Sequence, residues 1–115
     1  MTTLREEMEK SYADMLQDCE WGLEDVPVGW LEMVDSMLAS WDELKPQPRI
    51  HQIKSKFAML RVYGIGLSNA MCASWETVSM GTCETCGGAG DRSVERGWWR
   101  VECEDCKLDR KAGGV

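Results

Sequence analysis

Cys83-Glu84-Thr85-Cys86 and Cys103-Glu104-Asp105-Cys106 are the two stretches that decide how this chain of 115 residues folds. Each holds two cysteines three positions apart, and sixteen residues separate one stretch from the other. A Cys-x-x-Cys pair can turn both thiolates toward one side of a tight loop, and two such loops supply the four ligands of a tetrahedral zinc site. The spacing therefore predicts one structural Zn²⁺ ion held by Cys83, Cys86, Cys103 and Cys106.

The segment between the two pairs is predicted to be a β-hairpin. Glycines follow the first pair and free the backbone for a turn. Residues 93–96 and 98–102 can then pair as strands across Gly97. The unit from residue 82 to residue 107 is thus expected to be a zinc ribbon, followed by a tail of residues 108–115.

Two other roles for the four cysteines stay open, namely a redox-active dithiol and a set of buried free thiols. Zinc is favoured because both pairs have the spacing typical of structural zinc sites. Four thiolate ligands also leave no position for the water molecule that a catalytic zinc ion needs, so the ion is expected to be structural only. Cys19 and Cys72 fall on the apolar faces of predicted helices, where a cysteine usually acts as a small hydrophobic side chain.

Upstream of the ribbon, residues 1–81 are predicted to be mainly helical. Apolar residues recur every three to four positions over residues 4–20 and again over residues 28–45. Thr3 begins a capping-box pattern at the start of the first segment, and Pro46 ends the second. Two amphipathic helices with a short connection favour an antiparallel pair.

The stretch that follows mixes β-branched, aromatic and basic side chains without a helical period, which favours two short strands at about 50–54 and 59–64. Ser68 can cap a third helix that ends at Gly81. The expected fold class is therefore α+β, with an N-terminal helical pair, a short β-hairpin, a third helix and a C-terminal four-cysteine zinc ribbon. We expect a single composite domain over residues 1–115.

The net charge of −7 is unevenly spread along the chain. Residues 1–46 carry twelve acids and three bases, residues 47–75 carry four bases and no acid, and the remainder carries eight acids and six bases. A chain with a pI of about 4.7 is a poor general binder of DNA, because phosphate contacts dominate that affinity. A local basic patch is still compatible with this composition.

The sequence also bears on compartment and on catalysis. No basic start followed by an apolar run opens the chain, and no apolar stretch reaches the roughly 18 residues of a membrane span, so a cytosolic protein without a membrane partner is expected. His51 is the only histidine, and no Gly-rich phosphate loop, nucleophile elbow or His-Glu-x-x-His motif accompanies it. The chain is therefore predicted not to be an enzyme.

An acidic helix face is the first candidate surface for a partner. Glu32, Asp35 and Asp42 share one face of the second predicted helix. Such a face is usually only solvated. A dense acidic surface can also dock on a basic groove of a nucleic-acid-handling protein by charge complementarity.

A pair of tryptophans is the second candidate surface. Trp98 and Trp99 are neighbours in a predicted strand, where successive side chains point to opposite faces, so at least one is exposed unless both faces are covered. An exposed tryptophan beside Arg100 can stack on a nucleobase or anchor a protein partner. Packing of these side chains against the helices is the structural alternative.

Residues 52–63 resemble the K-E-K-F-G-G-L-R-F-Y signature of a family of small, largely uncharacterised zinc-ribbon proteins from bacteria and their phages. In that family a Gly-Trp segment precedes the signature, and a C-x-x-C-G, a second Gly-Trp and a second cysteine pair follow it. Gly29-Trp30, Cys83 to Gly87 and Gly97-Trp98 stand in the same order here, and the resemblance covers about residues 19–106. The resemblance implies a phage or prophage setting in the bacterial cytoplasm more than it implies an activity.

Two functions follow from these features. The leading hypothesis is a non-enzymatic zinc-ribbon interaction protein, a phage-encoded regulator or inhibitor of a host protein, for instance one that acts in defence or nucleic-acid handling. The alternative is a nucleic-acid-binding zinc-ribbon regulator, which would combine aromatic stacking with phosphate contacts. The cations available for that role are Lys54, Lys56, Arg61, Arg96 and Arg100. A thiol-redox or metal-dependent enzyme is the third and least favoured hypothesis.

Overall fold

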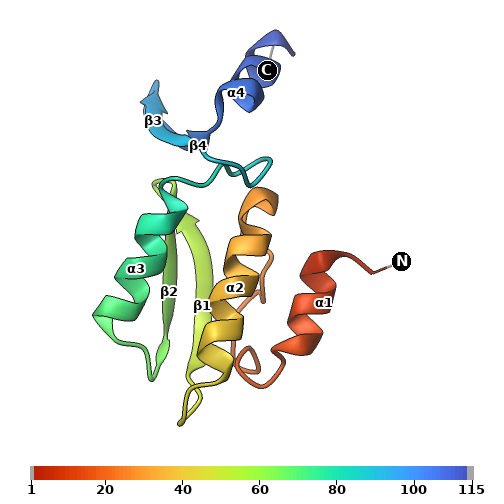
Figure 1. The fold of residues 1–115 in the computed structure, drawn as a ribbon, viewed down its shortest axis with the longest axis vertical. Helices are drawn as coiled ribbons and strands as arrows, with labels where there is room; N and C mark the ends of the chain where they lie inside the picture. The colour runs from red at the N-terminus through yellow and green to blue at the C-terminus, as the bar shows by residue number, and fades with distance from the viewer. Residues whose placement is uncertain (1, 114–115) are drawn as a thin grey trace.

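The computed structural model describes residues 2–113, which form two lobes that lie one above the other (Figure 1). The helical lobe, residues 2–81, contains α1 (Leu4–Ser11), the short 3-10 helix η1 (Val28–Trp30), α2 (Leu31–Asp42), β1 (Arg49–Lys56), β2 (Met59–Ile65) and α3 (Asn69–Ser79). The ribbon lobe, residues 82–113, contains β3 (Asp91–Glu95), β4 (Trp98–Glu102) and α4 (Glu104–Ala112). This is the predicted α+β arrangement, with the predicted elements in the predicted order and one further helix, α4.

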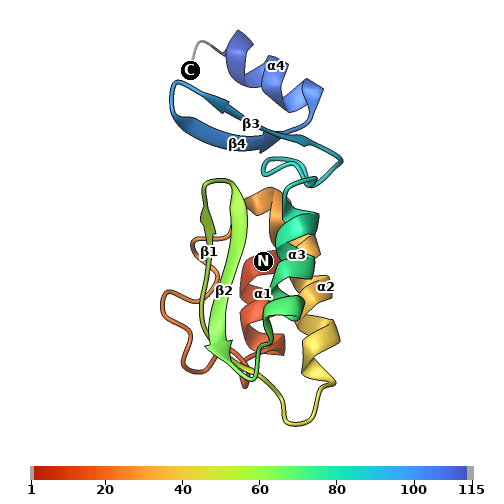
Figure 2. The same ribbon diagram turned by 90° about the vertical axis from the view of Figure 1, so that its left-hand side faces the viewer.

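The core of the helical lobe lies between the β1–β2 hairpin and the helices. Helices α2 and α3 cover one side of the hairpin, as Figure 2 shows, and α1 lies beside α2. Burial of each large apolar side chain contributes about 1.5–3 kcal/mol, so this core is the main source of stability in the lobe. Its most deeply buried members include Trp30, Val34, Met37, Leu38, Ile50, Ile53 and Leu60.

The β1–β2 hairpin closes through a two-residue turn at Phe57 and Ala58. Both residues have positive φ, 53° and 57°, which is the backbone that a tight hairpin turn of the I′ type requires. Neither turn residue is glycine, so the turn forms without the residue that most readily adopts positive φ. The two predicted strands are confirmed, and the antiparallel register pairs Ile53 with Val62 on the buried face.

The first helix is shorter than the sequence predicts, because α1 ends at Ser11 instead of near residue 20. Residues 12–26 continue as a series of turns and pass along the free edge of β1. There the N–H of Ile50 donates to the carbonyl of Met15 at 2.9 Å, which gives the strand edge a partner. Met15 is nevertheless fully buried. The apolar spacing therefore predicted burial correctly and backbone conformation wrongly.

The second predicted helix, residues 28–45, is confirmed in its central part. It begins as η1 and ends with α2 at Asp42, three residues early. The third predicted helix is confirmed with its cap, because the Ser68 hydroxyl accepts a hydrogen bond from the N–H of Met71 at 3.1 Å. A polar cap of this kind is a local signal, which explains why the sequence located it well.

Residues 108–113 are not the predicted tail, because they lie in α4 and its C-terminal cap; residues 114–115 lie outside the described residues. Cys103 caps this helix, and its first turn is acidic and its last turn basic, which complements the helix dipole. Arg110 then donates two hydrogen bonds, of 2.8 and 3.0 Å, to the carboxylate of Glu102 in β4. In the part of the chain that the structure describes, every helix is too short or too polar to cross a membrane.

Candidate metal centre

The four predicted cysteine ligands come together at one end of the ribbon lobe. The Sγ atoms of Cys83, Cys86, Cys103 and Cys106 all lie within 4.8 Å of one another, and those of Cys86 and Cys103 are 3.7 Å apart. Four thiolates at about 2.3 Å from a tetrahedral zinc ion would be separated by about 3.8 Å. The cluster is therefore positioned to bind a metal ion, and its donor set and spacing fit zinc.

The first loop holds its thiolates with backbone hydrogen bonds. The N–H of Cys83 donates to the carbonyl of Gly88 at 2.8 Å, and the N–H of Gly87 donates back to the carbonyl of Cys83 at 3.0 Å. The N–H of Gly88 lies 3.4 Å from the Sγ of Cys86. Gly87 has φ of +83°, a conformation that side chains disfavour, so glycine is needed where the loop turns back.

The second loop is the start of α4. The Sγ of Cys103 occupies the N-cap position and accepts from the N–H of Cys106 at 3.4 Å. The N-terminus of a helix carries partial positive charge, which stabilises a thiolate at this position. The helix that the sequence prediction missed therefore forms part of the site.

Electrostatics favour ionisation of the most buried ligand. Burial alone raises the pKa of Cys83, but hydrogen bonds from the backbone N–H groups of Cys86, Cys103 and Thr85 outweigh it and lower the pKa to about 6. Metal ions bind the thiolate form of cysteine, so this environment prepares Cys83 as a ligand.

The remaining two cysteines lie away from the cluster. Cys19 and Cys72 are half-buried, and their Sγ atoms lie 3.5 Å from the carbonyl of Gly22 and 3.8 Å from the carbonyl of Val62. Burial raises the pKa of both thiols, which keeps them protonated and weakly reactive. Substitution of Cys19 or Cys72 is therefore the control for substitution of one of the four candidate ligands.

The metal centre is docked on the helical lobe through η1. The N–H of Gly29 donates to the carbonyl of Glu84 at 2.7 Å, and the indole N–H of Trp30 donates to the carbonyl of Thr82 at 2.8 Å. A Cβ atom at Gly29 would overlap the backbone of Cys83 and Glu84. The first cysteine loop thus approaches the helical lobe as closely as its backbone allows.

These features define the class of fold as an α+β protein with a C-terminal four-cysteine ribbon. Its two strands pair in register from Asp91 with Glu102 to Glu95 with Trp98, and its turn at Arg96 and Gly97 has two positive φ angles. Models of protein families, curated proteins and solved structures yield no match to the chain.

The acidic candidate residues lie on α2, and two of them already have partners within the chain. Asp35 accepts a hydrogen bond from the hydroxyl of Tyr12 at 2.7 Å, and Asp42 accepts one from the side chain of Gln47 at 2.6 Å. Glu32 is exposed. Part of the charge of this predicted surface is therefore used in internal contacts.

The aromatic candidates divide between the two faces of β4. Trp98 is 64% exposed, whereas Trp99 packs against the core beneath Arg92, whose guanidinium carbon is 3.9 Å from the ring centre. Arg100 is half-buried, with its guanidinium carbon 5.8 Å from the ring of Trp98. The two predicted sets therefore lie on different lobes and do not form one surface.

Sequence reasoning did not identify Phe57 and Glu84 as neighbours of the tryptophans. Arg92 of β3 donates two hydrogen bonds, of 3.0 and 2.8 Å, to the carbonyl of Phe57, so the β1–β2 turn is held against the ribbon. A hollow of about 390 Å³ lies between them, and its lining includes Phe57, Glu84, Trp98 and Trp99. The residues come from three separate stretches, and no local spacing in the sequence links them.

Proposed function

We propose that this protein is a non-enzymatic binding protein whose ribbon lobe is stabilised by one structural zinc ion. The observation that carries the proposal is the convergence of four cysteine Sγ atoms within 4.8 Å of one another. Four protein ligands complete the coordination of zinc, so the ion would have no position for a reacting water molecule. The sequence adds a single histidine and no catalytic motif, which supports a binding role.

The ribbon side of the molecule is the better candidate for the contact surface. Trp98 and Phe57 are 64% and 58% exposed and line one hollow, and exposed aromatic side chains are typical anchors of macromolecular contacts. By contrast, Asp35 and Asp42 on α2 are partly used by internal hydrogen bonds. The acidic face remains the candidate site for a basic host protein.

The family resemblance supports a bacterial or phage setting for this binding role. In the cytoplasm of a bacterial host cell, a small binding protein of this kind would act as a regulator or inhibitor of a host component. That component would be a protein or a nucleic acid.

The metal part of the proposal is tested by elemental analysis of protein purified without chelator. We expect one zinc ion per chain, lost in Cys86→Ser and retained in Cys19→Ser and Cys72→Ser, which remove cysteines outside the cluster. Protein that is folded and free of metal, or that holds zinc equally well after Cys86→Ser, would overturn it.

The binding part is tested by affinity purification from bacterial lysate at physiological salt, with and without nuclease. A Trp98→Ala variant with normal zinc content serves as the matched control. We expect a macromolecule that wild-type protein retains and this variant loses. Recovery of no macromolecule of either class would reject the binding role, whatever the zinc content.

A further inference from the structure

The geometry points to the hollow between the β1–β2 turn and β4 as a binding site for an unpaired base of single-stranded nucleic acid. This inference rests on the proposed binding role and names the partner class. The site consists of Phe57 and Trp98 as stacking surfaces, Glu84 at the hollow, and cations along both flanks.

Two of the aromatic side chains that line the hollow are exposed. Phe57 and Trp98 are both more than half exposed, although each belongs to a well-paired hairpin. Trp99 also lines the hollow, but its ring is half-buried beneath Arg92 and is not counted as a stacking surface. A volume of about 390 Å³ accommodates a planar heterocycle, and base stacking on aromatic side chains tolerates any sequence because every base has a π-face.

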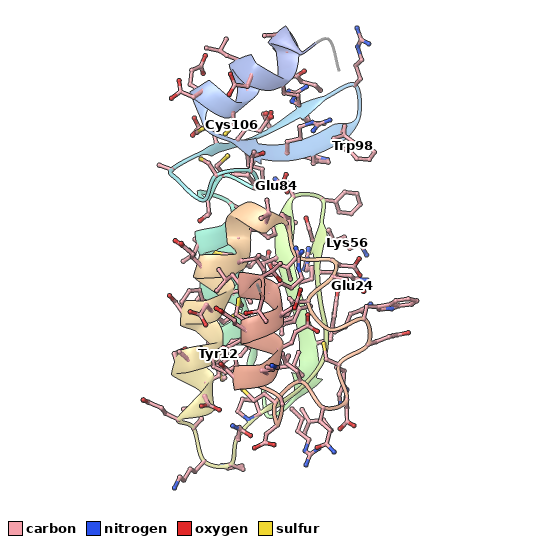
Figure 3. All side chains as sticks on the ribbon, turned by 90° about the vertical axis from the view of Figure 1, so that its right-hand side faces the viewer. Tyr12, Glu24, Lys56, Glu84, Trp98 and Cys106 are labelled. Carbon is pink, nitrogen blue, oxygen red and sulfur yellow. The ribbon has the colours of Figure 1, made fainter. Side chains whose placement is uncertain are left out.

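The cations on either side of these aromatics form no ion pair within 4.0 Å among the described residues, although Arg100 has Glu84 and Glu102 as acidic neighbours. On the β1 side, the ammonium groups of Lys54 and Lys56 lie 5.7 and 5.9 Å from the rings of Tyr63 and Phe57. Lys56 and Trp98 lie on the same side of the molecule in Figure 3. Among the described residues, neither lysine has a carboxylate within 4.0 Å.

On the ribbon side, Arg96 and Arg100 line a second hollow together with Trp98. Neither arginine forms an ion pair within the described chain. The neighbouring Glu95, in contrast, is surrounded by three bases, Lys107, Arg110 and Lys111, at 3.6 to 3.8 Å. In a chain of net charge −7, free cations thus flank exposed aromatics. This combination is typical of single-strand binding surfaces.

Arg61 is the one predicted phosphate contact that does not join this surface. Its guanidinium pairs with Glu76 of α3 at 3.5 Å. The proposed surface therefore includes the other four predicted cations, Lys54, Lys56, Arg96 and Arg100.

A carboxylate decides which ligand fits. Glu84 lines the hollow itself, so a phosphate or an acidic peptide side chain is disfavoured there, whereas the exocyclic amino group of a base can donate to it. A strand bound at this site would run between Lys56 on one side of the hollow and Arg96 and Arg100 on the other. A basic peptide would meet the four free cations and be repelled.

The test is fluorescence anisotropy of a labelled single-stranded oligonucleotide of about ten nucleotides, at roughly 50 mM salt, with zinc-loaded protein. We expect Trp98→Ala and Phe57→Ala each to weaken binding about tenfold, since loss of one stacked base has an effect of that order. Trp21→Ala is the matched control. Trp21 is 60% exposed but lines neither hollow, so its removal should leave the affinity unchanged.

The charge and base contacts are tested separately. Lys56→Gln and Arg100→Gln should each reduce the slope of log affinity against log salt by about one. Glu84→Gln should abolish any preference for oligo-dC over oligo-dT, while Trp98→Ala weakens both alike. Zinc content and near-ultraviolet circular dichroism confirm that each variant is folded.

Three outcomes of the binding assay would overturn the inference. They are the absence of binding by folded, zinc-loaded protein at low salt, equal affinity of wild type and Trp98→Ala, and stronger binding to duplex than to single strands. A nuclease-resistant protein partner that depends on Trp98 would also overturn it, since the surface would then bind protein. In that case the proposed binding role would stand.

Discussion

The helical lobe buries a continuous set of apolar side chains, whereas the ribbon lobe contributes only Cys83 and Val101 to the buried apolar residues of the described chain. The first lobe can therefore be stabilised by burial, at about 25 cal/mol per Å² of apolar surface. The ribbon lobe cannot be stabilised by burial in this way, because a unit of this size has too little interior of its own. The contrast predicts that the two lobes depend on different forces, apolar burial in the helical lobe and metal ligation in the ribbon lobe.

Removal of the metal is expected to have the largest effect and to separate the lobes. Structural zinc contributes on the order of 10 kcal/mol in small modules, so chelation or Cys103→Ser should disorder residues 83–107 while the helical lobe keeps partial helicity. Protons compete with metal for the thiolates, so zinc affinity should fall as the pH falls.

Far- and near-ultraviolet circular dichroism before and after a strong chelator measure this separation. Elemental analysis verifies that zinc has gone. If the full near-ultraviolet tryptophan signal persists in verified metal-free protein, the ribbon lobe does not depend on ligation. The contrast between the lobes then disappears.

Gly29→Ala tests whether the lobes are independent or coupled. The new Cβ would overlap the backbone of Cys83 and Glu84, so η1 and the first cysteine loop must separate. We expect a loss of about 3 kcal/mol in the free energy of unfolding, at the upper end for overpacking, together with weaker zinc binding.

Gly81→Ala is the matched control for this substitution. Gly81 has a conventional φ, and its Cβ would meet only the carbonyl of Val78 at an ordinary 3.8 Å. Denaturant unfolding and zinc competition with a chromogenic chelator measure both variants. Equal stability and zinc affinity of the two would show that the docking contact at η1 is loose.

The elements that the sequence predicted well depend on local signals. The cysteine pairs, the Ser68 cap and the strand pattern on either side of Phe57 are each decided within a few residues. The elements that it missed depend on distant partners. Residues 12–26 leave the helix because the edge of β1, which follows later in the chain, offers backbone hydrogen bonds.

The two predicted partner surfaces show the same limit. Strand alternation predicted that at least one of Trp98 and Trp99 is exposed unless both faces of the strand are covered, and the structure shows Trp98 exposed. The hydrogen bond of Asp35 with Tyr12 joins residues 23 positions apart, and the contact of Phe57 with Arg92 joins residues 35 positions apart. Pattern and spacing carry no information about such pairs. The acidity of α4's first turn and the basicity of its last were the signal for that helix that the prediction did not use.

Arg110→Ala tests whether ligation is the only support of the ribbon lobe. Arg110 holds α4 to β4 through two hydrogen bonds to Glu102, whose carboxylate is almost fully buried. Removal of Arg110 leaves that carboxylate without a charged partner, and we expect the free energy of unfolding to fall by about 2 kcal/mol. This is less than for a fully buried pair, because Arg110 is partly exposed.

The control is Lys111→Ala, which removes an exposed contact with Glu95 at 3.6 Å and should change stability by less than about 1 kcal/mol. Thermal unfolding of zinc-loaded protein measures both. Equal values for the two variants would mean that the metal alone supports the lobe.

The smallest effect is expected from the hydrogen bond between Tyr12, the residue that caps the end of α1, and Asp35 of α2, in the lobe that burial stabilises. Burial, followed by the hydrogen bond to Asp35 and the charge of Asp35, raises the pKa of Tyr12 from 10.0 to about 12. Because the folded state has the higher pKa, protonated Tyr12 stabilises it at a pH below 10, and this contribution to stability is lost as the pH rises from about 10 to about 12.

Tyr12→Phe removes one hydrogen bond of 2.7 Å and should lower the free energy of unfolding by about 1 kcal/mol at neutral pH. Stability should also decrease less at alkaline pH in Tyr12→Phe than in the wild type. Urea unfolding of both proteins at a series of pH values from about 8 upward measures this difference. Tyr63→Phe, which changes an exposed tyrosine, is the control. An alkaline fall of equal size in wild type and Tyr12→Phe would show that α1 is held by apolar burial alone, which would sharpen the contrast with the ribbon lobe.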